Sequence, residues 1–421
     1  MTSERGCYVF VVLPGETEFT VAGRFRVSET RAGSRLGEFV YGRSYLRRPD
    51  AVELDPVELR LAERVYRTGR MEGFFGVIRD AMPDYWGRLL IERRSGRTML
   101  DEFDYLMLGP DDRAGALGFG SQLEPPRPRR RFNAVVDLSR LQAAADAVLA
   151  DRFEVTGAVA DRARELLLAG TSMGGARPKA LVEDGEALWI AKFRQASDRW
   201  NLPRVEHGLL RLARRCGLDA AESRVERIGD RDALLVRRFD RERTGDGYLR
   251  HRMASALTLL RADDSPTDRR RWSYLSLADE VRRASASPRE DLRELFGRMC
   301  FNAAVSNLDD HPRNHALLAR GRSWRLSPAY DLEPMPVVAV ERRDLAMVCG
   351  PRGRRANRAN LLAAAGRFLL GRDEARAIFN HVTETIRGSR RQTMRRAGVS
   401  DRDSERIRDA FLYDGLFLDA G

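Results

Sequence analysis

The sequence predicts an α+β protein in which a small mixed α/β part precedes a mostly helical part. Short apolar runs separated by turn residues predict β-hairpins within residues 1–240. From Ser255 onward, apolar residues recur at helical spacing, with one β-like interruption between Ala316 and Leu326. The chain contains no run of about 18 apolar residues, so a membrane-spanning helix is not expected.

Residues 1–122 are expected to form an N-terminal subdomain, followed by a Pro- and Arg-rich linker at 123–132. A Pro14-Gly15 turn between two apolar runs predicts an antiparallel hairpin. The expected elements are strands at 8–13 and through Phe19 and Val21, and helices at 56–67 and 74–91, the second interrupted at Pro83.

Residues 133–240 are expected to form a second α/β part, and residues 241–421 a helical lobe. An Asp184-Gly185 turn predicts a β-hairpin, and Gly217 predicts the end of a helix. The expected elements are helices at 138–149, 159–168 and 204–216, and strands at 180–182, 188–193, 223–228 and 233–238.

The composition limits the compartment and the partners. A net charge of +12 favours nucleic-acid binding, but 62 acidic residues are interleaved with the basic ones, and compact basic runs occur only at 127–131 and 269–271. Direct DNA contact is therefore expected at most as a secondary function. Four widely spaced cysteines and an N-terminus without signal-peptide character predict a cytoplasmic protein with reduced, structural cysteines.

Lysine is almost absent from this basic chain. Of 74 basic residues, only Lys179 and Lys192 are lysines. Because arginine has replaced lysine almost everywhere else, each remaining lysine indicates a site that needs a compact ammonium and not a planar guanidinium. Chance is the alternative.

A glycine pair precedes the first of these lysines. Gly174 and Gly175 allow backbone N–H groups to converge on an anion, to which Lys179 adds charge, but the spacing is not that of a Walker A loop. An ordinary tight turn is the alternative. Lys192 ends the following predicted strand and could reach nucleotide phosphates, with Glu206 as its ion-pair partner, or could be a lysine at a strand edge.

The strongest motif lies at 307–314 and is followed by Asp331. In kinase-like catalytic loops an Asp accepts the proton of the substrate hydroxyl, an Asn five residues later binds metal, and a second Asp beyond a hairpin completes the Mg²⁺ site. Asp309, Asn314 and Asp331 have this spacing. Asp310 and His311 leave open a His/Asp metal site or a helix cap.

With these motifs, nearly the whole chain resembles the HipA family of serine/threonine kinases, the toxins of toxin–antitoxin systems. Segments 74–88, 112–116 and 236–241 are similar to the family's N-terminal segment, Gly-Ala turn and adenine hinge. The resemblance implies a kinase-like, two-lobed α+β fold, with nucleotide binding in 133–240 and catalysis in 241–421. It also implies ATP and Mg²⁺ as cofactors, Asp309 as the catalytic base, and Asn314 and Asp331 as the Mg²⁺ ligands. The remaining nucleotide contacts that it implies are Gly174, Gly175, Ala176, Arg177, Pro178, Lys179, Lys192, Arg237, Arg238, Phe239, His311, Pro312, Arg313 and Tyr330.

The resemblance further implies partners and regulation. A HipB-like helix-turn-helix antitoxin would bind the kinase and bring it to DNA, and the substrate would be a protein of translation such as an aminoacyl-tRNA synthetase. Ser172 aligns with a serine that such kinases autophosphorylate, although a turn serine is the alternative. A small-molecule kinase, or an inactive scaffold that docks an antitoxin on DNA, are the other functions that the sequence leaves open.

Overall fold

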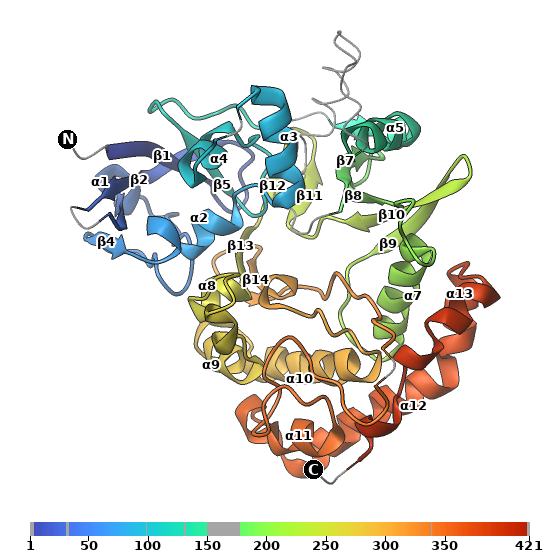
Figure 1. Cartoon of the computed structure of the whole chain (residues 1–421). Coiled ribbons are helices and arrows are strands. Elements are labelled where there is room, and N and C mark those ends of the chain that lie inside the picture. Colours follow the sequence, from blue (N-terminus) through green and yellow to red (C-terminus); the bar gives the residue numbers. More distant parts are fainter. Residues whose placement is uncertain are drawn as a thin grey trace. The chain divides into compact units, whose positions relative to one another are not determined.

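The computed structural model describes residues 4–30, 33–97, 99–129, 132–149, 177–337 and 339–418. Figure 1 labels its helices and strands. Residue contacts divide the chain into two compact units. The first unit comprises Met1–Phe193, Leu235–Ala254 and Leu318–Trp324, and the second comprises Arg194–Leu234, Ser255–Leu317 and Arg325–Gly421.

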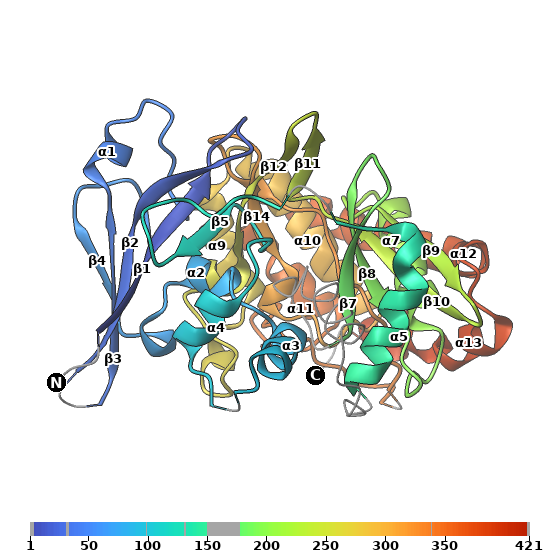
Figure 2. The ribbon, with the colours of Figure 1, turned by 90° about the horizontal axis from the view of Figure 1, so that it is seen from above.

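The first unit opens with a five-stranded sheet in the order β4-β3-β2-β1-β5, in which every strand pair is antiparallel (Figure 2). The hairpin expected around Pro14-Gly15 is confirmed, since β1 and β2 pair from Glu4 with Ser28 to Val12 with Phe19. Alternating residues of these strands, such as Phe25 and Phe39, are fully buried. The strands are β1 (Glu4–Val12), β2 (Phe19–Glu29), β3 (Arg35–Tyr41), β4 (Val65–Thr68) and β5 (Leu117–Gly120).

Four short helices accompany this sheet. The predicted interruption at Pro83 is confirmed, because one helix ends before it and the next begins after it. Asp84 caps the second of these helices by accepting a 2.8 Å hydrogen bond from the backbone N–H of Gly87, and Gly96 ends it with a left-handed φ of +63°. The helices are α1 (Arg43–Leu46), α2 (Gly76–Asp80), α3 (Tyr85–Ser95) and α4 (Glu102–Leu108).

The helix predicted at 56–67 is wrong. Oδ1 of the buried Asp55 accepts hydrogen bonds from the backbone N–H groups of Val57, Glu58 and Leu59 at 2.7, 2.6 and 3.4 Å. The Tyr41 and Tyr66 hydroxyls donate to the carbonyl groups of Leu59 and Arg60. These bonds replace the helical ones, so the apolar residues anchor a loop that leads into β4.

A second five-stranded sheet has the order β6-β7-β8-β10-β9. The boundary between the two units falls within β10, between Leu234 and Leu235. Strand β7 pairs with β8 in antiparallel register, as the Asp184-Gly185 turn predicts. The predicted helix at 159–168 lies outside the described residues. The elements are β6 (Asn133–Ala134), α5 (Leu138–Leu149), β7 (Lys179–Glu183), β8 (Leu188–Phe193), β9 (Ser223–Ile228), β10 (Arg231–Arg237), β11 (Arg241–Thr244) and β12 (Gly247–Arg250).

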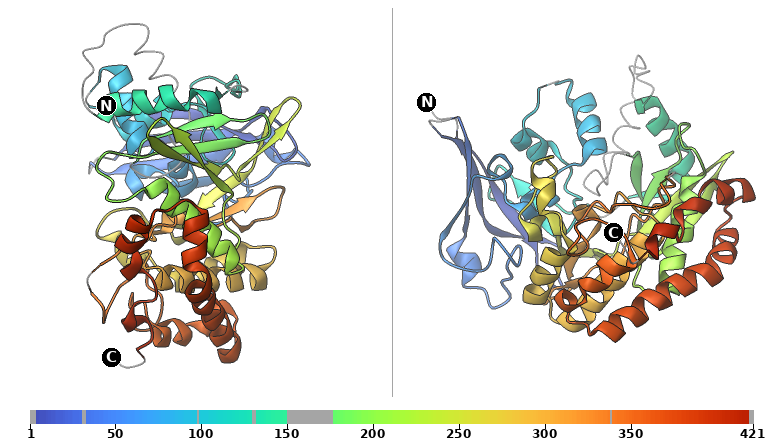
Figure 3. Two further views of the ribbon diagram at one scale, coloured as in Figure 1. Left: turned by 90° about the vertical axis from the view of Figure 1, so that its right-hand side faces the viewer. Right: turned by 60° about the horizontal axis from the view of Figure 1, so that its bottom comes forward.

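From Ser255 onward the chain is mostly helical, as predicted (Figure 3). Helix α10 packs against α9 and α12, and α12 also packs against α7, around buried side chains such as Phe296, Met299 and Phe379. None of the described helices is long and apolar enough to cross a membrane. The helices are α7 (Leu202–Arg215), α8 (Ala256–Leu260), α9 (Tyr274–Ala284), α10 (Pro288–Ala304), α11 (Arg358–Ala363), α12 (Arg372–Arg396) and α13 (Asp401–Arg406).

Short elements complete the chain. The β-like interruption predicted between Ala316 and Leu326 is confirmed, because two strands occur there. Cys7, Cys216, Cys300 and Cys349 are all free and buried, as expected. The remaining elements are β13 (Arg252–Ser255), β14 (Ala316–Ala319), β15 (Arg325–Leu326) and the 3₁₀ helices η1 (Met71–Gly73), η2 (Val135–Asp137), η3 (Asp268–Arg271), η4 (Pro312–Asn314), η5 (Ala365–Phe368), η6 (Arg408–Ala410) and η7 (Asp414–Leu416).

Asp55 makes the stability depend on pH. Burial raises the pKa of its carboxyl group to about 6, and Oδ2 has no partner among the described residues. Because the folded protein holds this proton up to a higher pH than the unfolded chain does, the free energy of unfolding falls as the pH rises from about 4 to about 6. In Asp55→Asn, the decrease in the free energy of unfolding between about pH 4 and pH 6 should be smaller by up to about 3 kcal/mol, measured by urea unfolding across that range. Asp50→Asn, at a half-exposed site, is the matched control, and equal pH dependence in the wild type and Asp55→Asn would contradict the assignment.

Candidate active site

The loop between α10 and β14 carries two of the predicted functional residues. Asp309 is exposed, and its backbone carbonyl accepts a 2.8 Å hydrogen bond from the N–H of His311. Asn314 ends η4 and is buried. Both residues belong to the second unit, so the exposed carboxylate and the buried amide are held by one short, partly helical segment.

A buried hydrogen-bond network supports this loop through Asp310. The Tyr274 hydroxyl donates to Oδ2 of Asp310, which also lies 3.0 Å from Nε2 of His315. Nδ2 of Asn302 donates to the Tyr274 hydroxyl at 3.0 Å. Burial, reinforced by the charge of Asp310, raises the pKa of Tyr274 well above its ordinary value, so this hydroxyl stays protonated. The two adjacent aspartates therefore differ: Asp310 is committed to the network, whereas Asp309 is exposed.

Two predicted nucleotide contacts bind each other. The Tyr330 hydroxyl donates to the carbonyl of Arg313 at 2.5 Å. The guanidinium of Arg313 is directed to Asp264, with Nη2 at 2.6 Å and Nε at 3.0 Å from Oδ2. This pairing orients the side chain of Arg313 toward the loop that follows α8.

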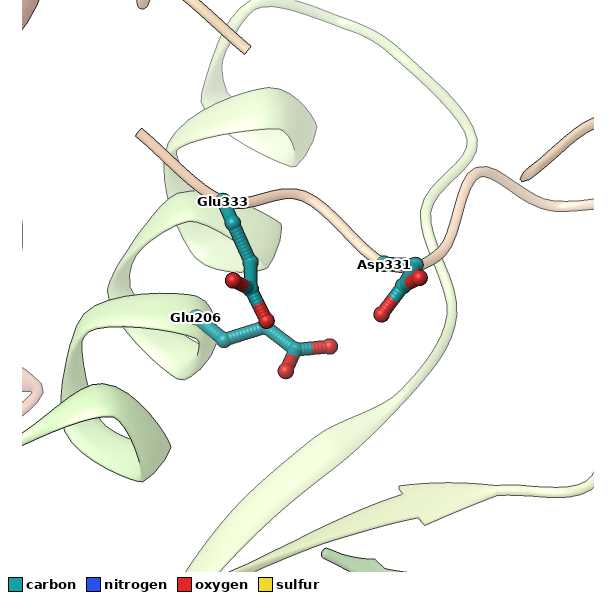
Figure 4. Close-up of side chains that lie close together, drawn as sticks. All are labelled: Glu206, Asp331 and Glu333. Atoms are coloured by element: carbon teal, nitrogen blue, oxygen red, sulfur yellow. The ribbon is translucent and has the colours of Figure 1, made fainter. Parts of the chain in front are cut away.

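Three carboxylates of the second unit converge on one point (Figure 4). One oxygen each from Glu206, Asp331 and Glu333 lies within 4.8 Å of the others. Glu206 projects from α7 and is 2% exposed, whereas Asp331 and Glu333 follow β15. Asp331 has a left-handed φ of +58°, a conformation that is uncommon for non-glycine residues and that aspartate tolerates better than most. An all-oxygen set of this kind suits a hard divalent cation such as Mg²⁺.

Sequence reasoning found only part of this cluster. It predicted Asp331 but missed Glu333, although acidic residues at 331 and 333 directly after the hairpin were the available indication. It assigned Glu206 to Lys192, and that ion pair stays a prediction. Among the described residues, this cluster is the group of three His, Cys, Asp or Glu side chains whose ligand atoms converge closely enough to hold a metal ion, and it does not include Asp310 or His311.

The two lysines occupy one rung of the β7–β8 ladder in the first unit. Lys179 and Lys192 are directly opposed, which places their side chains on the same face of the sheet. Lys179 is buried, and its Nζ lies 2.6 Å from Oδ2 of Asp84. The Nε1–H of Trp86 donates to the Lys179 carbonyl at 3.1 Å. Asp84, which also caps α3, was missed by sequence reasoning because it lies 95 residues away in the chain.

The predicted hinge segment is tied into a buried ion network in the first unit. Nη1 of Arg238 lies 2.6 Å from Asp112 and its Nη2 lies 2.8 Å from Asp240, which also accepts a bond from the Gly115 N–H. Burial disfavours the charge of Asp112, but Arg238 and Arg241 lower its pKa below the usual range. The side chain of Arg238 is thus used inside the unit, and a nucleotide contact at this position would have to come from its backbone.

Five of the other predicted residues lie at the ends of elements or next to them. Arg177 and Pro178 lead directly into β7, Arg237 ends β10, Phe239 follows it, and Pro312 begins η4. Four predicted residues lie outside the described part of the chain: Ser172, Gly174, Gly175 and Ala176.

Removing the Tyr274 hydroxyl should weaken the support of the catalytic loop. Tyr274→Phe leaves the Asn302 amide without its acceptor and takes one donor from Asp310. We expect a loss of about 1–3 kcal/mol in the free energy of unfolding, measured with urea. Tyr85→Phe, at a position that is 68% exposed, is the control and should change little. Equal stability of Tyr274→Phe and the wild type would show that the network does not support the loop.

The carboxylate cluster should bind a divalent cation without any nucleotide. We expect Asp331→Asn and Glu333→Gln each to weaken Mn²⁺ binding, measured by isothermal titration calorimetry, by at least about tenfold, because each removes one negative charge from the cluster. Glu384→Gln, at an exposed position on α12, should leave the affinity unchanged. Unaltered Mn²⁺ affinity in both cluster variants would exclude the cluster as the metal site.

Comparison with known protein families and relatives shows what this chain is similar to. A model of the HipA N-terminal domain matches residues 20–120, and a model of the HipA-like C-terminal domain matches residues 171–389. The candidate kinase Y4mE of Sinorhizobium fredii is 32% identical over 134 residues, which span 30% of this chain and 30% of that relative.

Solved structures give the fold. A chain from the complex of HipA, HipB and operator DNA of the Shewanella oneidensis toxin–antitoxin system superposes with a TM-score of 0.67 at 16% identity, covering 96% of this chain and 94% of that one. The proinflammatory kinase CtkA of Helicobacter pylori gives a TM-score of 0.37 at 13% identity over 53% of this chain and 92% of its own. The predicted α+β, kinase-like fold class is confirmed. Because the C-terminal model alone matches more than half of the 421 residues, the chain belongs to the HipA family.

Proposed function

We propose that the chain is an ATP-dependent serine/threonine protein kinase that acts as the toxin of a toxin–antitoxin pair. The observation that carries the proposal is the oxygen cluster of Glu206, Asp331 and Glu333, held in the same unit as the exposed Asp309. Phosphoryl transfer needs such a combination, because a metal must neutralise the phosphates while a free carboxylate orients the attacking hydroxyl.

In this proposal, Asp331 and Asn314 would hold Mg²⁺, and Glu206 and Glu333 would contribute further negative charge. When bound, the ion neutralises the charge of the ATP phosphates. The exposed carboxylate of Asp309 accepts the proton of a serine or threonine hydroxyl as the hydroxyl oxygen bonds to the γ-phosphorus. The bond between that phosphorus and the oxygen that bridges to ADP then breaks, and ADP leaves with the electron pair.

The two lysines are assigned to the phosphates of ATP. Their opposed positions on one face of β7 and β8 would let both ammonium groups act on the same anion. The ion pair with Asp84 orients the ammonium of Lys179. Gly174, Gly175 and Ala176 are assigned to the same phosphate site, and Phe239 to the adenine ring.

Partners and regulation follow from family membership as further parts of the proposal. A HipB-like helix-turn-helix antitoxin would restrain the kinase and bring it to operator DNA, and the substrate would be a protein of translation such as an aminoacyl-tRNA synthetase. Autophosphorylation of Ser172 would add about −1.5 to −2 charge beside the phosphate site and would silence the kinase by repulsion.

The proposal is tested by phosphate transfer from γ-labelled ATP to a cell extract, with Mg²⁺ present. Asp309→Asn should lower the transfer by at least about 10², because it removes the base but not a buried contact. Asp230→Asn, in the exposed turn between β9 and β10, is the control and should retain full activity. Transfer by Asp309→Asn at the wild-type rate, or no transfer by the wild type under any of these conditions, would refute the assignment.

A further inference from the structure

One of the compact basic runs in the sequence lies beside the catalytic loop. The segment 263–272, which follows α8, is held on that loop by two side-chain contacts. Arg313 binds Asp264 through the 2.6 Å ion pair, and the Trp272 ring meets the His311 ring edge to face at 6.3 Å between centroids. Trp272 is buried, and its Nε1–H donates to the Asp263 carbonyl at 3.1 Å. The segment is therefore a fixed neighbour of the residues that flank Asp309.

Four arginines gather on this segment and next to it, and we call them the basic patch: Arg269, Arg270, Arg271 and Arg354. The first three belong to η3 and are exposed. The Arg269 guanidinium lies over the Trp272 ring, 5.4 Å from its centroid. Nη2 of Arg354 donates to the Arg269 carbonyl at 2.6 Å, which ties the fourth arginine to the same surface.

The acidic residues of the segment only partly offset this charge. Asp264 is bound to Arg313, and Oδ1 of Asp263 accepts a bond from the Ser265 N–H at 2.7 Å. Asp268 accepts a 3.0 Å bond from the Asp263 N–H and lies 3.9 Å from Arg271. The patch therefore keeps an excess of positive charge that faces water.

We propose that the basic patch docks an acidic segment of the protein substrate close to the serine or threonine that receives the phosphate. This inference rests on the proposed kinase function and adds a substrate class to it. Arginine binds carboxylates through a planar fork of donors, and several exposed arginines select an acidic partner mainly by electrostatic complementarity. A four-residue patch suits a short acidic segment better than a nucleic acid, which engages more numerous phosphate contacts.

Binding of labelled peptides, measured by fluorescence anisotropy, tests the docking without any catalysis. The probe is a peptide with one serine next to a run of glutamates, and its reference is the same peptide with glutamines. We expect the wild type to bind the glutamate peptide at least about fivefold more tightly at low salt, and this preference to shrink as salt screens the charges.

The triple variant Arg269→Gln/Arg270→Gln/Arg271→Gln should lose the preference for the glutamate peptide. The matched control, Arg372→Gln/Arg376→Gln/Arg396→Gln, removes three exposed arginines from α12 and should keep it. Unchanged autophosphorylation and urea unfolding of the patch variant would show that its fold and catalytic residues are intact.

Several results would overturn the docking proposal: equal binding of the two peptides by the wild type, a preserved preference in the patch variant, or loss of it in the control. Binding of a single-stranded RNA in place of the glutamate peptide would also overturn it and would identify a nucleic-acid surface. Failure of the kinase proposal is a separate result, because it appears as absent phosphate transfer whatever the peptides do.

Discussion

Three carboxylates converge in the second unit, and the cost of holding like charges together is the constraint on which the candidate site depends. At separations of up to 4.8 Å and an effective dielectric constant of about 20, each pair of charges repels by about 3 kcal/mol. The fold nevertheless brings them together from two elements distant in sequence, and it places Asp331 in a left-handed conformation to do so. A divalent cation bound among the three oxygens would offset two of the three negative charges and would so stabilise their shared site.

The supporting contacts have a common purpose, which is to hold this site in place. Asn201 caps α7, the helix that carries Glu206, and it also donates to Asp232 at 2.6 Å. The buried Tyr274 and His315 fix Asp310 and thereby leave its neighbour Asp309 exposed. In the first unit, the Asp112–Arg238–Asp240 network fixes the backbone on both sides of Phe239. Each of these supporting residues positions a predicted functional residue indirectly, by fixing a group next to it.

The fold could be predicted from the sequence wherever one local pattern decided the structure. Helix α5 and strands β8 and β9 have the predicted bounds because their periodicity meets no competing bond. The segment 56–67 failed because a single buried carboxylate, that of Asp55, captures three backbone N–H groups, and helical periodicity does not reveal such competition. Local pattern is thus sufficient for elements but not for loops anchored by side chains.

The candidate site shows the same division. Asp309, Asn314 and Asp331 were found because their spacing along the chain is itself the motif. The roles of Asp84 and of the buried Arg238 were not found, because their partners Lys179 and Asp112 lie 95 and 126 residues away in the chain. The contrast between lysine and arginine was informative: the chain keeps its only two lysines on one rung of β7 and β8 and uses arginine forks for the buried ion network.

We infer that the carboxylate cluster binds a metal that the nucleotide requires. The decisive experiment is isothermal titration of the wild-type protein with ATP, in the presence and in the absence of Mg²⁺. We expect binding with Mg²⁺ and an affinity at least about tenfold lower without it, since a divalent cation would reduce the repulsion between the carboxylates of the cluster and the phosphates. Equal ATP affinity in the two conditions, or no ATP binding in either, would contradict it.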